Sequence, residues 1–69
     1  MKKYSLMEVI LQLSVDSRLR FTRVNDLEFE VFRGKYGDIM MKVGRFVKPL
    51  PYFNYVHDEW IRKETKKWI

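Results

Sequence analysis

The chain has 69 residues, of which 46% are hydrophobic and 33% charged, and its formal net charge is +5. This length allows one domain, over residues 1–69, and excludes a large enzyme with a deep interior cleft, because a chain of this size buries only about 60% of its unfolded surface. With no cysteine and one histidine, it also excludes disulfides, cysteine nucleophiles and metal sites built from thiolates or several histidines of one chain.

The first predicted element is a helix over about residues 5–15. Ser5 and Glu8 have the spacing of a capping box, in which each side chain accepts a hydrogen bond from the other residue's backbone N–H. Apolar residues then recur at helical spacing, and Met7 and Leu11 widen the apolar surface to more than half of the helix girth. A helix this apolar is either covered by a sheet or used at an oligomer interface.

Residues 18–33 predict two antiparallel strands joined near Asp26. An odd-length loop collects the apolar side chains on one face of this hairpin, whereas a two-residue loop mixes apolar and acidic groups. Since a slip of one residue moves every side chain to the opposite face, we expect the odd-length loop. The facing pairs then include Phe21–Val31 and Arg23–Phe29.

The second half of the chain predicts further strands. A turn with two glycines over residues 34–38 leads into a third strand over Asp38–Val43, and a short strand at Phe46–Val47 is an option. Two prolines then force an irregular connection, followed by an aromatic loop over residues 52–55. The segment from Trp60 fits either an edge strand or a helical face, and we favour a strand with a frayed basic tail.

Together these elements predict an α+β fold, with an N-terminal helix packed on a small twisted antiparallel β-sheet of three to five strands. One helix covers only one face of such a sheet, and small domains commonly compensate by associating, so we expect a homo-oligomer. The predicted core residues are Leu6, Ile10, Leu13, Phe21, Phe29, Val31, Ile39, Met41 and Trp60.

The sequence gives little support for catalysis, metal binding or a membrane location. The serines lie on or beside the predicted helix, far in sequence from His57, and Glu28 and Glu30 on an exposed hairpin are typical partners for basic side chains. Consecutive residues such as 57–59 do not converge on one metal ion. The apolar run over residues 6–15 is too short to span a bilayer and is interrupted by polar residues. We therefore predict a cytoplasmic protein that is not an enzyme, with no membrane association, metal or cofactor.

Positive charge and aromatic side chains define the predicted binding surface. Between Arg33 and Lys48, five basic residues stand against Asp38 alone. This excess attracts phosphates or an acidic protein face, although it is equally typical of a solvated surface that keeps a small protein soluble. Aromatic rings stack on bases and dominate protein interfaces, and a core this small does not hold them all. The candidate ligand-binding residues are Arg23, Lys35, Tyr36, Lys42, Arg45, Lys48, Tyr52, Tyr55 and Trp60.

Three short motifs resemble those of small proteins from tailed bacteriophages and prophages. They are Ser5-Leu-Met-Glu-Val-Ile, Arg18-Leu-Arg-Phe-Thr-Arg23 and Asp58-Glu-Trp-Ile. The same outline is found in the small Thoeris anti-defence proteins, which sequester a cyclic ADP-ribose-type signalling nucleotide and assemble as oligomers. The resemblance implies nucleotide capture, with Arg23 and Trp60 at the matching positions. The chain departs from that family at Val24-Asn25, where members usually carry a tryptophan, and it lacks their glycine-rich turn after the helix.

We therefore predict a non-catalytic binding protein of phage or prophage type that acts in the cytoplasm of a bacterial host. It would capture a host protein or an anionic nucleotide through its basic, aromatic surface. The alternative is a small protein that binds single-stranded DNA or RNA with the same surface, since aromatic rings stack on bases while cations hold phosphates.

Overall fold

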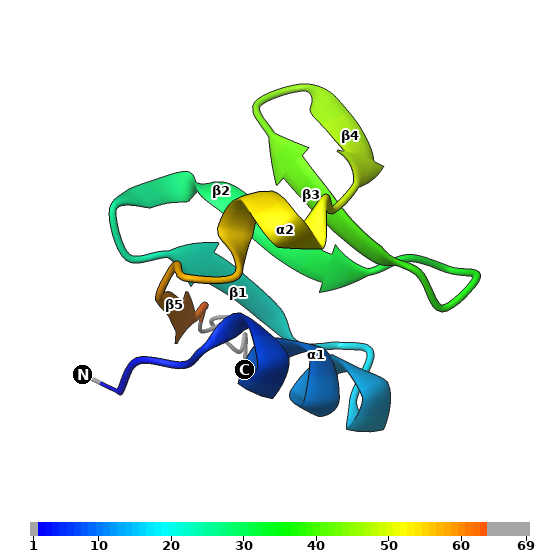
Figure 1. The fold of residues 1–69 in the computed structure, drawn as a ribbon. Coiled ribbons are helices and arrows are strands. Elements are labelled where there is room, and N and C mark those ends of the chain that lie inside the picture. Colours follow the sequence, from blue (N-terminus) through cyan, green and yellow to red (C-terminus); the bar gives the residue numbers. More distant parts are fainter. Residues whose placement is uncertain (1, 64–69) are drawn as a thin grey trace, which may run out of the picture.

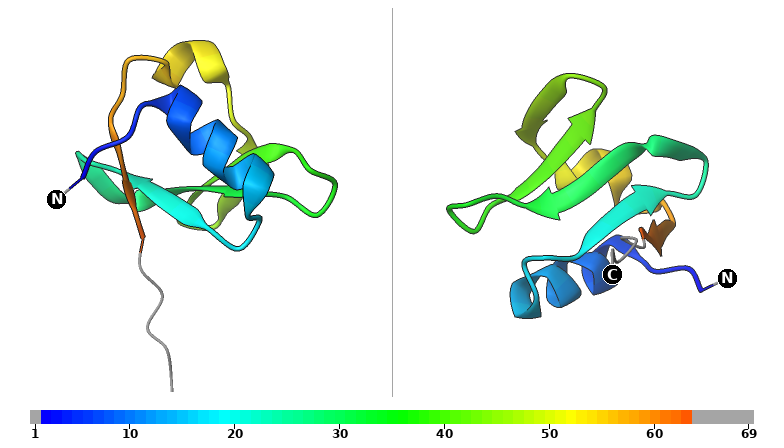
Figure 2. Two further views of the ribbon diagram at one scale, coloured as in Figure 1. Left: turned by 90° about the horizontal axis from the view of Figure 1, so that it is seen from below. Right: turned by 180° about the vertical axis from the view of Figure 1, so that it is seen from behind.

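The computed structural model describes residues 2–63, in which two helices lie on one face of a five-stranded antiparallel sheet (Figures 1 and 2). The sheet order is β4-β3-β2-β1-β5, so β4 and β5 are its two edges. The predicted α+β fold is confirmed. The elements in chain order are α1 (Leu6–Val15), β1 (Arg20–Arg23), β2 (Asp26–Arg33), β3 (Ile39–Val43), β4 (Phe46–Pro49), the one-turn helix α2 (Tyr52–Tyr55) and β5 (Trp60–Arg62).

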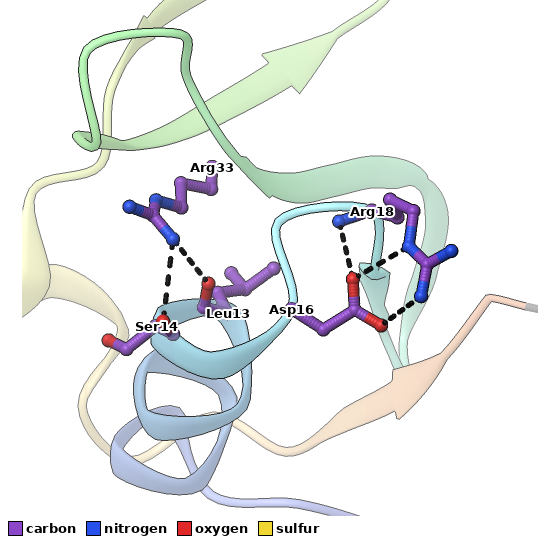
Figure 3. Close-up of polar contacts among 5 residues, drawn as sticks. All are labelled: Leu13, Ser14, Asp16, Arg18 and Arg33. Carbon is purple, nitrogen blue, oxygen red and sulfur yellow. Dashed lines mark hydrogen bonds and ion pairs between the residues drawn. The ribbon is translucent and has the colours of Figure 1, made fainter.

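Helix α1 begins at the predicted capping box. The backbone N–H of Ser5 donates to Glu8 Oε1 at 2.9 Å, and the backbone N–H of Glu8 donates to Ser5 Oγ at 3.2 Å. At the other end, Arg33 Nη1 donates to the carbonyl oxygens of Leu13 and Ser14, each at 3.4 Å (Figure 3). Arg33 therefore ties the end of α1 to β2 and satisfies carbonyl groups that no later helical turn can pair.

The capping box makes the stability of α1 depend on pH. The backbone N–H of Ser5 donates to the Glu8 carboxylate and lowers the pKa of Glu8 below its ordinary value of 4.5. A carboxyl group whose pKa is lower in the folded state stabilises the fold above its unfolded pKa, and that stabilisation is lost as the pH falls through the folded pKa.

The variant Glu8→Gln keeps a side-chain oxygen as acceptor but removes the charge. We expect it to unfold at a lower urea concentration than the wild type near neutral pH, and the difference between the two midpoints to shrink as the pH falls below about 4. Urea titrations at about pH 7 and about pH 3 measure this. A difference that stays constant with pH would contradict the role of the Glu8 charge.

The first hairpin confirms one predicted pairing and corrects another. Phe21 lies opposite Val31 as expected, but Arg23 pairs with Asp26 and not with Phe29, because the register shifts between Thr22 and Arg23. The expected odd-length loop is wrong, since β1 and β2 are joined by the two residues Val24 and Asn25. No non-glycine residue within residues 2–63 has positive φ, so the two turn residues cannot adopt the tight hairpin turns that match strand twist. Extra residues of β2 form a bulge, which compensates for the difference in twist between this turn and the strands. Phe29 remains in the core.

The remaining elements follow the sequence expectations with one correction. The option of a short strand at Phe46–Val47 is realised as β4, and the strand at Trp60 is confirmed over Trp60–Arg62, whereas the predicted basic tail at residues 64–69 lies outside the described residues. The predicted aromatic loop over residues 52–55 is instead the helix α2. The backbone N–H of Asn54 donates to the Pro51 carbonyl at 3.1 Å, and Pro51 is the N-cap of this turn, where its missing N–H removes no intrahelical hydrogen bond.

The core lies between the two helices and the sheet. Eight of the nine predicted core residues are buried, and the ninth, Ile10, is partly buried and packs against them. The prediction missed Val9 of α1 and Leu50, which follows β4. Within residues 2–63 no helix is long and apolar enough to cross a membrane.

Candidate binding surface

The hairpin of β3 and β4 carries an uncompensated positive charge. We call residues 39–50 the basic hairpin, because they include Lys42, Arg45 and Lys48 and no acidic residue. All three side chains are exposed, and none takes part in an ion pair with another residue of the described range. Glu30, which faces Lys42 across the sheet, is bonded to Lys63 Nζ at 2.9 Å. The three cations are therefore available to an external anion.

Apolar side chains are exposed on the same hairpin. Phe46 is 80% exposed, and its neighbour Val47 is also open to solvent. Both belong to the edge strand β4, and Gly44, with φ of 59°, allows the tight two-residue turn at residues 44–45 that joins β3 to β4. Aromatic and cationic side chains together are typical of protein interfaces. Phe46 is not among the binding residues predicted from the sequence, although its place between Arg45 and Lys48 could have indicated it.

The surface around the basic hairpin is open and not cleft-like. The hollow beside it is shallow, about 360 Å³, and carboxylates share its lining with cations. Glu28 and Glu30 in that lining would repel a phosphate group. The hollow is lined by Leu27, Glu28, Glu30, Lys42, Gly44 and Lys63.

Two candidate residues lie away from this surface. Lys35 and Tyr36 belong to the turn between β2 and β3, where the Lys35 ammonium sits 5.4 Å from the Tyr36 ring centroid and the ring is exposed. Arg45 lies beyond the opposite end of β3. Five extended residues span about 16 Å, so a small ligand does not touch both ends of the hairpin at once.

Three other candidate residues are engaged inside the fold. Arg23 Nη2 lies 3.1 Å from Asp58 Oδ2, and the Arg23 guanidinium lies over the rings of Phe29 and Tyr55, at 5.3 and 5.4 Å from their centroids. Trp60 is fully buried and packs edge-on against Phe29 with ring centroids 5.7 Å apart. The ring of Trp60 is therefore a core group that offers no surface to a ligand, and Tyr55 packs against it with ring centroids 6.4 Å apart. Tyr52, at the start of α2, remains open to solvent.

The motifs behind the phage-protein resemblance have structural roles here. Ser5 caps α1, Arg23 pairs with Asp58, and Trp60 fills the core. These interactions stabilise the fold and do not by themselves specify a ligand. Within residues 2–63 no three histidine, aspartate or glutamate side chains are placed to hold a metal ion. Comparison with known proteins finds no matching family model, no matching curated protein and no matching solved structure.

Proposed function

We propose that this is a non-catalytic binding protein that captures an acidic partner protein through the basic hairpin. The observation that carries the proposal is that the hairpin has three exposed cations with no acidic partner within residues 2–63 and an exposed ring on an edge strand. Lys48 and Phe46 are on the face of the sheet that the helices cover, and Lys42 is on the opposite face. The cations attract an acidic surface over a distance of about a Debye length, and Phe46 adds apolar contact on the same face as Lys48 once the surfaces meet.

The open shape of the surface favours a protein over the anionic nucleotide as the partner. A nucleotide is held best in a concave site that buries most of its surface, whereas the hollow beside the hairpin is shallow and partly acidic. The phage and prophage resemblance supplies the setting of the proposal. The partner would be a host protein in the cytoplasm of a bacterium, and capture would be stoichiometric.

Single-stranded DNA or RNA is the second candidate. It is favoured by the position of Phe46 between Arg45 and Lys48, because an exposed ring stacks on a base while neighbouring cations hold the phosphates. The affinity of such a complex falls steeply as the salt concentration rises.

Fluorescence polarisation with three labelled probes tests the proposal. The probes are an extended peptide of alternating glutamate and valine, an oligothymidylate of about 20 nucleotides, and ADP-ribose. We expect the acidic peptide to bind, and the triple variant Lys42→Glu, Arg45→Glu, Lys48→Glu to bind it at least about tenfold more weakly. Phe46→Ala should also weaken binding, because it removes apolar contact without changing charge.

The control carries the same change of charge away from the hairpin, as Lys2→Glu, Lys3→Glu, Lys35→Glu. Retained peptide binding in this control assigns the effect to the hairpin and not to the net charge. An equal loss in both triple variants would contradict the proposal. Preferential, strongly salt-dependent binding of the oligothymidylate would support nucleic acid as the partner, and preferential binding of ADP-ribose would support nucleotide capture.

A further inference from the structure

Helix α1 carries a second apolar stripe that the sheet does not cover. Leu6, Val9 and Leu13 are buried on the core side. Met7, Leu11 and Val15 are exposed, at 66%, 60% and 89%. These exposed residues recur every four positions and therefore lie on one face of the helix.

A shallow groove runs beside this stripe. Its volume is about 460 Å³. Leu11, Val15 and Leu19 form the apolar part, while Gln12, Asp16 and Arg62 supply polar groups. A neighbouring helix fits such a surface, because the side-chain ridge of one helix packs into the groove beside the ridge of another.

We propose that the occupant of this groove is a second copy of the chain, with the two α1 helices packed antiparallel about a twofold axis near Leu11. In this arrangement Leu11 meets Leu11 of the partner subunit, and Met7 meets Val15 of the partner subunit. The stripe is self-complementary, as a twofold interface requires. The opposed helix dipoles favour the same orientation.

Charge complementarity supports a second copy as the occupant. Glu8 and Gln12 are four residues apart and lie on one side of the stripe, and Gln12 borders the groove together with Arg62. A twofold axis across antiparallel helices brings this side of one helix against the same side of the other. Glu8 of one copy then lies toward Asp16 and Arg62 of the other. Asp16 is already paired with Arg18 of its own copy at 3.1 Å, whereas Arg62 takes part in no ion pair within residues 2–63, so Arg62 is the charge left to face Glu8.

The rest of the molecule is consistent with this choice. Pairing of two β4 edge strands is an unfavourable dimer interface, because it would bring the cations of two basic hairpins together. The β5 edge is covered at Trp60, which pairs through its backbone with Tyr4. The groove includes Arg62 of β5, and β4 is at the opposite edge of the sheet. A dimer through α1 therefore leaves both basic hairpins free, and the inference does not depend on the proposed function.

Analytical ultracentrifugation tests the dimer. We expect the wild type to sediment at twice the chain mass of 8.5 kDa at about 100 µM, and Leu11→Glu to sediment as a monomer with an unchanged circular dichroism spectrum. Phe53→Glu is the matched control, because Phe53 is 96% exposed on α2, and it should remain dimeric. A monomeric wild type at that concentration, or a dimeric Leu11→Glu variant, would overturn the proposal.

Cysteine cross-linking tests the antiparallel arrangement, because the chain has no native cysteine. Leu11→Cys should form a disulfide-linked dimer on oxidation. Met7→Cys should not. Each Met7 lies four residues, or about 6 Å of helix rise, from the twofold axis, and the two lie on opposite sides of it. They are therefore about 12 Å apart along the paired helices, which is too far for a disulfide. Efficient cross-linking of Met7→Cys, or none of Leu11→Cys, would contradict the arrangement.

Discussion

Replacing Trp60 with alanine is expected to remove most of the free energy of unfolding. Trp60 is fully buried, and its ring packs against Phe29 and Tyr55 with centroids 5.7 and 6.4 Å away. Truncation of a buried aromatic side chain costs about 3–5 kcal/mol, whereas a domain of this size is stable by only about 3–10 kcal/mol. The variant should therefore be largely unfolded or close to its unfolding midpoint at 25 °C.

Urea unfolding followed by far-ultraviolet circular dichroism measures this loss without depending on tryptophan fluorescence. Phe53→Ala is the matched control, because it also removes an aromatic ring but from an exposed position, and it should change stability by less than about 0.5 kcal/mol. Trp60→Phe should cost less than Trp60→Ala. It keeps one ring in the core and removes an indole N–H that is buried without a hydrogen-bond partner among the described residues. A stable Trp60→Ala variant would show that Trp60 is not the centre of the core.

Replacing Arg23 with alanine is expected to destabilise the fold by about 2–3 kcal/mol. The guanidinium loses its contacts with the rings of Phe29 and Tyr55, and Asp58 loses the cation that lies 3.1 Å from its Oδ2 atom. That oxygen is buried and has no aligned hydrogen bond, so the ion pair is its main compensation. Removing one partner of such a pair leaves the other charge unpaired.

A double-mutant cycle with Asp58→Asn separates the two contributions. The double variant Arg23→Ala, Asp58→Asn should be more stable than the sum of the single losses predicts, by about 1 kcal/mol or more, because the unpaired charge is then gone. Arg23→Lys should recover only part of the loss, since lysine lacks the planar group that stacks on the rings. If Arg23→Ala leaves stability unchanged, Arg23 is free for a ligand and the structural role is wrong.

Local patterns were sufficient to predict α1 and most of the strands, but not the one-turn helix α2. Ser5 and Glu8 are three residues apart, and that spacing alone identifies the start of α1. The alternation of apolar and polar residues identifies the strands and the pairing of Phe21 with Val31, because only that register keeps one face apolar. The bulge in β2 was not predictable in this way. The bulge depends on the backbone conformation of the turn between β1 and β2. Sequences with the same alternation of apolar and polar residues can form that turn without a bulge.

The candidate binding residues show the limit of sequence reasoning. Charge and aromatic content predicted a binding surface of nine residues, but the sequence does not say which of them share a face. The topology puts Lys35 and Arg45 beyond opposite ends of β3 and turns Trp60 into the core. It leaves Lys42, Arg45 and Lys48 on one hairpin, where Lys48 shares a face with Phe46 and Lys42 is on the opposite face.

The amino-acid sequence by itself determined the helix and most of the strands, the apolar faces that form the core, and the excess of positive charge. Each of these depends on residues that are close together in the chain. Only the tertiary structure decided that Arg23 pairs with Asp58, that Trp60 is inaccessible, and that Met7, Leu11 and Val15 remain exposed. These outcomes depend on which distant segments pack together, and packing alone determines which of several similar apolar or charged side chains is covered.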